Sequence, residues 1–209
     1  TLRWFSGKEW NKYPSTKLNC LLFYAEAINT IYAAMDLSYR GYYSESMALA
    51  RIVYETFVRV VFISVFPGRM DEVFDLNKFK IKNAEQDIKI ELYEMYQMLS
   101  NFTHSHKVDV TAQLADLISR PGASIQVSAA YDEDRFTGTH NLVLFLLWAL
   151  ISILPEVFQE LEAASEWMAE HKFLEAEIGR WFYALQKDFW KKAAAQLPIA
   201  RDRIRMART

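Results

Sequence analysis

Apolar residues recur every three or four positions along most of the chain, which is the spacing of one face of an α-helix. The pattern predicts helices over 16–38, 44–66, 83–104, 140–164 and 165–196, a short helical segment within 69–80, and a basic helix over 199–208. Gly41 and Pro67-Gly68 mark turns, and Pro155 is expected to kink or divide its helix. The chain is therefore predicted to be all-α, a single domain (1–209) built as an antiparallel bundle of five to six major helices.

Two segments are set apart from the main bundle. Residues 105–139 lack long periodicity and are predicted to be a long irregular insertion, a kind of segment that is often functional or mobile. Residues 198–209 form a basic C-terminal tail that carries four arginines, Arg201, Arg203, Arg205 and Arg208. The tail is open to two interpretations, contact with RNA or DNA phosphates or, as the stronger expectation, a solvated or disordered terminus.

Composition narrows the class of protein. Hydrophobic residues make up 52% of the 209, enough for a sizeable core, and glycine (6) and proline (5) are scarce, as in helical proteins. The net charge of −2 gives no overall field that attracts nucleic acid or an acidic membrane. The apolar stretch Leu142–Leu154 is shorter than the roughly 20 residues that span a bilayer, and Met47–Phe66 contains three charged residues. Both stretches are expected to be buried helices, with no membrane as partner.

The single cysteine, Cys20, excludes an internal disulfide framework and a cysteine-based zinc site. It lies among leucines, where a buried and unreactive thiol is expected. Together with the lack of a signal-peptide pattern, this indicates a cytoplasmic protein.

The predicted helix over 44–66 carries a ladder of charges. Arg51, Glu55 and Arg59 stand four residues apart within an otherwise apolar segment, so Glu55 can bond both arginines. The ladder is either an ordinary stabilising stripe or one wall of a cleft shared with another helix.

A second group of polar side chains lies in the predicted helix over 83–104. Tyr96, Ser100 and His104 are four residues apart and share one helical face, with His106 and Asp109 just beyond. A histidine can donate or accept a proton near neutral pH, which makes His104 the best candidate for general acid–base catalysis. The alternative is that His104 bonds a neighbouring carboxylate and holds two helices together.

Other chemistries fit this region less well. His104, His106 and Asp109 could share a metal only if the helix ends there, and no Glu-x-x-His pair accompanies them. Ser100 and His104 lack the sequence around a nucleophilic serine, and the chain has no glycine-rich phosphate loop or dinucleotide fingerprint. No metal and no cofactor are therefore expected.

Two segments together resemble a known family. An R-x3-E helix (Arg51, Glu55) followed by a Y-x2-L-S-x3-H helix (Tyr96, Ser100, His104) looks like a family of uncharacterised bacterial all-helical proteins, similar in pattern to the HEPN superfamily. The resemblance covers roughly residues 20–160 and implies a HEPN-like bundle in which these five residues converge in one pocket.

The resemblance also implies a function. Many HEPN proteins are dimeric, metal-independent ribonucleases of toxin–antitoxin and phage-defence systems, so RNA and a second copy of the chain become the expected partners. His104 would act as general acid–base, Arg51 would stabilise phosphate charge, and Ser100 and Tyr96 would orient the substrate. The HEPN motif places an arginine four to six residues before the histidine, whereas no arginine precedes His104 or His106 at that spacing, and Ser100 and Asn101 occupy the region. The alternative is a non-catalytic interaction or regulatory module in which the same residues form a buried network.

Overall fold

The computed structural model describes residues 14–75, 78–104, 132–159, 165–184 and 188–208. These residues contain eight α-helices and no strand, so the predicted all-α class is confirmed. The helices are α2 (Ser15–Tyr39), α3 (Tyr43–Val65), α4 (Met70–Phe74), α5 (Ile81–Ile88), α6 (Tyr93–His104), α8 (Glu133–Val157), α9 (Ser165–Ala184) and α10 (Asp188–Met206), with a 3-10 turn, η2, at Pro67–Arg69. Their number exceeds the five to six major helices expected because two of the predicted helices are each divided and the short helix α4 is counted.

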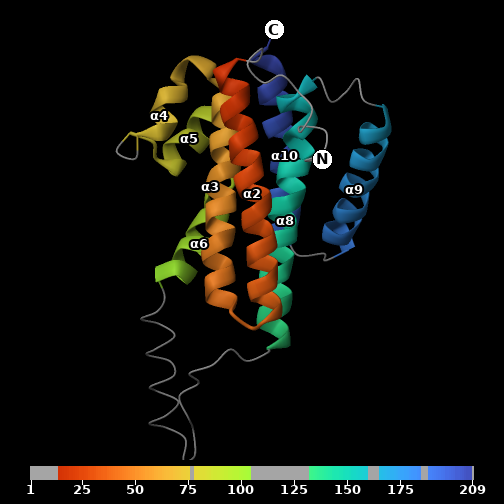
Figure 1. The fold of residues 1–209 in the computed structure, drawn as a ribbon. Helices are drawn as coiled ribbons and strands as arrows, with labels where there is room; N and C mark the ends of the chain where they lie inside the picture. Colours follow the sequence, from red (N-terminus) through yellow and green to blue (C-terminus); the bar gives the residue numbers. More distant parts are fainter. Residues whose placement is uncertain (1–13, 76–77, 105–131, 160–164, 185–187, 209) are drawn as a thin grey trace, which may run out of the picture.

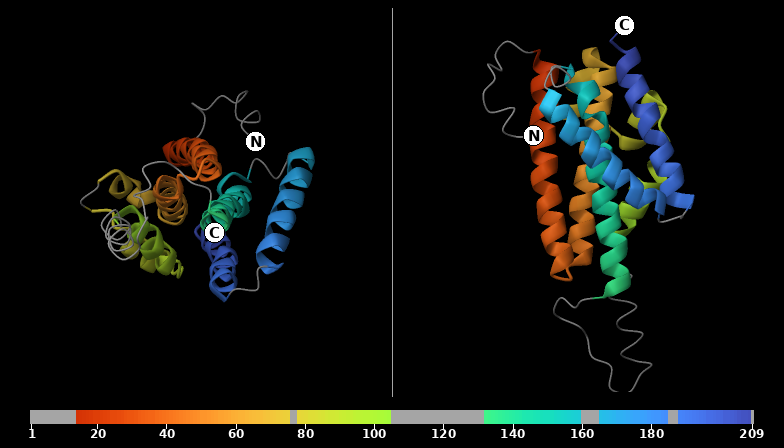
Figure 2. Two further views of the ribbon diagram at one scale, coloured as in Figure 1. Left: turned by 90° about the horizontal axis from the view of Figure 1, so that it is seen from below. Right: turned by 90° about the vertical axis from the view of Figure 1, so that its right-hand side faces the viewer.

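Three long helices, α2, α3 and α8, run side by side through the centre of the bundle (Figure 1). Helix α3 also contacts α5, α6 and α10, so one helix touches most of the others. Helix α10 packs against α8, and α9 lies on the outer side of both, away from α3 (Figure 2). The apolar faces of these helices meet in one continuous core.

The turn between α2 and α3 depends on Gly41, whose φ is 81°. The Tyr42 N–H donates to the Leu37 carbonyl at 2.9 Å, and the Gly41 N–H donates to the Ser38 carbonyl at 3.1 Å. This pair of bonds is the Schellman motif, which requires a left-handed residue that glycine adopts without steric cost. The chain therefore reverses direction here, and α3 packs antiparallel against α2.

The predicted helix over 83–104 is divided into α5 and α6. Lys89 takes the left-handed conformation, with φ 65° and ψ 46°, and ends α5. Ile88, Ile90 and Leu92 are all buried, at 0%, 4% and 4% exposed. A continuous helix would point Ile90 away from the other two, so the need to bury all three favours the break.

Helix α8 begins earlier than predicted. Residues 133–139, expected to be irregular, are helical, while 105–131 lie outside the described residues. Asp132 caps the helix, since its carboxylate accepts from the Arg135 N–H at 2.9 Å, and the Asp132 N–H donates to the Tyr43 hydroxyl at 2.9 Å. Pro155 lies within the last turn, and the helix continues to Val157.

The C-terminal prediction also needs correction. The expected helix over 165–196 is divided into α9 and α10, and residues 185–187 between them lie outside the described part. Helix α10 runs through Pro198 instead of starting after it. Leu197, Ala200 and Ile204 are 2%, 0% and 0% exposed, so this basic segment packs on the core rather than forming a solvated tail.

Helix α8 is the one helix in the described ranges that is long and apolar enough to cross a membrane, with a mean hydropathy of 1.7 over its most apolar stretch. That stretch is 72% buried within the protein. Its apolar surface is covered by α2, α3, α9 and α10, as expected for a central core helix.

Candidate functional site

The charge ladder of α3 forms as its spacing predicts. The Arg51 Nε donates to Glu55 Oε1 at 3.0 Å, and Arg59 Nη2 donates to Glu55 Oε2 at 3.3 Å. The three side chains are 25%, 20% and 19% exposed in the order Arg51, Glu55, Arg59. The ladder is therefore half-buried, neither a solvated stripe nor a sealed core group.

Tyr96 connects this ladder to α6. Its hydroxyl accepts a hydrogen bond from Arg51 Nη2 at 3.0 Å, and the Arg51 guanidinium lies 5.2 Å from the centre of the Tyr96 ring. The same ring packs against Tyr54 of α3 at 6.0 Å and stacks on Tyr93 at 5.5 Å. The four residues Arg51, Glu55, Arg59 and Tyr96, here called the Arg51 network, thus join two helices that are distant in sequence.

Two further cation–π contacts lie beside the Arg51 network. The Arg59 guanidinium lies 5.7 Å from the Phe79 ring, and Lys82 Nζ of α5 lies 5.6 Å from the Tyr93 ring. Each such contact contributes about 0.5–1 kcal/mol at partly exposed positions. Phe79, Lys82 and Tyr93 were not predicted, because residues that meet between separate segments of the chain leave no local spacing signal.

The structure brings together three of the five residues expected to converge, namely Arg51, Glu55 and Tyr96. Ser100 lies one turn further along α6, and its hydroxyl oxygen is buried. His104 is the last residue of α6, but its side chain lies outside the described part of the structure.

The hydrogen bonds within the Arg51 network limit which ligands it can bind. The Arg51 guanidinium is engaged by a carboxylate on its own helix and by a phenol on α6, and Glu55 is shared by two arginines. A phosphate that approached Arg51 would compete with Glu55 for the same donors. The arrangement is suited to holding α6 on α3.

The metal alternative has no support among the described residues, which contain no group of three or more His, Cys, Asp or Glu side chains placed to hold an ion. Two of its candidate ligands, His106 and Asp109, lie outside the described ranges.

Cys20 is 2% exposed, and burial raises the pKa of its thiol to about 11. The thiol is therefore protonated at neutral pH, and the expectation that Cys20 is buried is confirmed.

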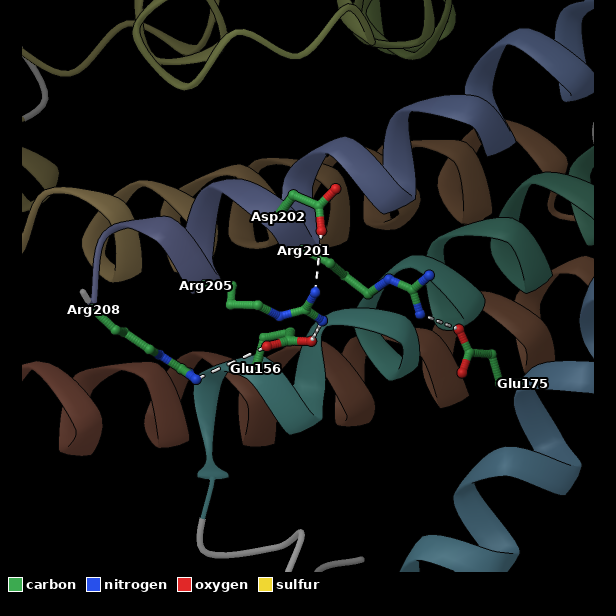
Figure 3. Close-up of polar contacts among 6 residues, drawn as sticks. All are labelled: Glu156, Glu175, Arg201, Asp202, Arg205 and Arg208. Carbon is green, nitrogen blue, oxygen red and sulfur yellow. Dashed lines mark hydrogen bonds and ion pairs between the residues drawn. The ribbon is translucent and has the colours of Figure 1, made fainter.

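Arg201, Arg205 and Arg208, in and just after the C-terminal helix, bind acidic side chains (Figure 3). Glu156 at the end of α8 is 8% exposed and binds Arg205 Nη2 at 2.5 Å and Arg208 Nη1 at 3.9 Å. Arg201 binds Glu175 of α9 at 3.0 Å. Three of the four arginines that suggested phosphate contact are thus paired within the protein, where they tie α10 to α8 and α9.

Comparison with known proteins adds no relative: no protein-family model matches the chain, and neither a curated protein nor a solved structure matches it.

Proposed function

We propose that the protein is a non-catalytic interaction or regulatory module of the helical-bundle type, in which the Arg51 network fixes the position of α6 against α3. One observation carries this proposal: the Arg51 guanidinium bonds Glu55 and Tyr96 at the same time, at 3.0 Å each. A half-buried polar network of this kind favours one helix register, because any slip leaves charged groups without partners.

The outer face of α9 supports an interaction role. Phe173, Leu174 and Trp181 are 63%, 47% and 52% exposed. Leu174 and Trp181 stand seven residues apart and so share one side of the helix. Large apolar side chains left on a surface are typical of sites that bind other proteins.

A double-mutant cycle between Arg51→Met and Tyr96→Phe is expected to give a coupling of about 1 kcal/mol in the free energy of unfolding. The reason is that each change removes one side of the 3.0 Å bond that joins α3 to α6. Urea unfolding followed by circular dichroism measures the four stabilities.

The control is the pair Asp36 and Arg40, which lie four residues apart on α2 and also make a 3.0 Å contact, but whose side chains are 57% and 66% exposed. Its coupling should be about 0.5 kcal/mol or less. Equal coupling in the two cycles would mean that the Arg51 network is an ordinary surface ladder without a role in fixing α6.

A ribonuclease of the HEPN-like kind is the second candidate. It is supported by the course of α6, which runs as one helix from Tyr93 to His104, so that Tyr96, Ser100 and His104 occupy the same helical face. In this mechanism His104 moves the proton while Arg51 neutralises phosphate charge, and Ser100 and Tyr96 orient the RNA. Glu55 would hold Arg51 in place.

An RNA cleavage assay with and without chelator separates the two candidates. The module proposal expects no cleavage above background from the wild-type chain. Cleavage that resists chelator, is lost in His104→Ala and is kept in His140→Ala, a histidine of α8 outside the network, would establish the ribonuclease instead. Cleavage that survives His104→Ala would remove that residue from the mechanism.

A further inference from the structure

A cleft of about 760 Å³ opens between the first turns of α3, α8 and α10 and the middle of α6. Its apolar lining comes from Met47, Met98, Leu142, Phe189 and Trp190. Sites for small molecules usually enclose roughly 300–1,000 Å³ and combine apolar walls with a few placed polar groups. None of the described lining residues belongs to the Arg51 network. A ligand-binding role for the cleft is therefore independent of the function proposed above.

One polar side chain in this lining is fixed in orientation. Asn141 is 6% exposed, and its carboxamide oxygen accepts a hydrogen bond from the Trp181 Nε1 at 3.0 Å. The oxygen is therefore oriented toward Trp181 of α9, and the NH₂ group of the same carboxamide points the other way. That NH₂ has no acceptor among the described residues and is not fully enclosed, which leaves a free donor at the wall of the cleft.

The rim of the cleft is negative. Glu133 and Asp134 lie in the first turn of α8, and neither forms an ion pair with another described residue. Arg135 also lines the rim, and its guanidinium lies 3.8 Å from the Asp132 carboxylate. Two carboxylates against one paired cation leave the rim negative, so its field disfavours an anionic ligand.

From this lining we propose that the cleft binds a small aromatic molecule without negative charge that carries a carbonyl or hydroxyl oxygen. The ring system packs between the thioethers of Met47 and Met98 and the rings of Phe189 and Trp190. The ligand oxygen accepts from the Asn141 NH₂ group.

Gly138 provides a way to close the cleft without disturbing the core. It stands three and four residues before Asn141 and Leu142, so the three share one face of α8. A Cβ added at Gly138 meets no atom within 4 Å. Gly138→Trp should therefore fill the cleft while leaving the bundle intact.

The test is a fluorescence titration with prodan, an uncharged naphthalene ketone. The wild-type chain is expected to bind it saturably in the micromolar range with a blue-shifted emission, and Gly138→Trp to weaken binding at least about tenfold. Asn141→Ala, which removes the NH₂ donor together with the acceptor for Trp181 Nε1, should weaken binding about five- to tenfold. Anilinonaphthalene sulfonate, an anion with a similar ring system, should bind about tenfold more weakly than prodan.

The matched control is Gly68→Trp, because Gly68 also has no atom within 4 Å of an added Cβ but does not line the cleft. This variant should bind prodan as the wild type does. Circular dichroism establishes that all variants keep the helical fold. No saturable binding by the wild type, or equal binding by the Gly138 and Gly68 variants, would overturn the proposal.

Discussion

Replacing Phe182 with alanine is expected to lower the free energy of unfolding by about 3–5 kcal/mol. Phe182 is 2% exposed and lies between three aromatic side chains of the neighbouring helices. It stacks on Trp148 at 5.6 Å, meets Phe145 edge-on at 5.5 Å, and packs against Trp190 at 5.2 Å. Removal of the ring leaves a cavity where α8, α9 and α10 meet, and urea unfolding followed by circular dichroism measures the loss.

The matched control is Phe173→Ala on the same helix. Phe173 is 63% exposed, so its truncation should change stability by about 0.5 kcal/mol or less. Similar losses in the two variants would show that α9 does not pack on α8 and α10 through Phe182.

Stability is also expected to fall as pH rises through the neutral range, because of Glu85. This side chain is 2% exposed, and one of its carboxyl oxygens has no hydrogen-bond partner among the described residues. Burial raises the pKa of its carboxyl from 4.5 to about 8. The folded protein therefore keeps Glu85 protonated in a range where the unfolded chain has lost that proton.

The direction of this change in stability with pH follows from proton linkage. Since the folded pKa lies above the unfolded one, the contribution to stability is fully present below pH 4.5 and is lost by about pH 8. Within this window the Glu85 contribution falls by about 1.4 kcal/mol per pH unit.

The measurement is urea unfolding from pH 5 to pH 8 for the wild type and for Glu85→Gln, which mimics the neutral carboxyl. The stability of Glu85→Gln should change much less between pH 5 and pH 8 than that of the wild type. At pH 8 the variant should be the more stable protein. Glu94→Gln, an exposed carboxylate of α6, serves as the control and should follow the wild type. A parallel decline in the wild type and Glu85→Gln would remove Glu85 as the cause.

The parts of the fold that the sequence predicted well are those with a local cause. The expected helices over 16–38 and 44–66 appear as Ser15–Tyr39 and Tyr43–Val65, because apolar periodicity and Gly41 mark their extent. The ladder of Arg51, Glu55 and Arg59 also follows from local spacing, since residues four apart on a helix are neighbours.

The divisions of the helices were not predicted, because their causes are distant in sequence. The break at Lys89 carries no glycine or proline, and it is explained by the burial of Ile88, Ile90 and Leu92 against other helices. The first turns of α8 were not predicted because Gly138 and a run of acidic residues are typical of a loop. The cap at Asp132 and its hydrogen bond to Tyr43, which start the helix, are visible only in the structure.

The sequence by itself determined the all-α class, the helical face that carries Tyr96 and Ser100, and the charge ladder on α3, since each depends on contacts within a turn or two of helix. Tertiary structure alone decided which groups meet between helices. The bond from Arg51 to Tyr96 spans 45 positions, and that from Arg205 to Glu156 spans 49. The cleft beside Asn141 likewise exists because four helices converge there, and only chain packing brings such distant groups together.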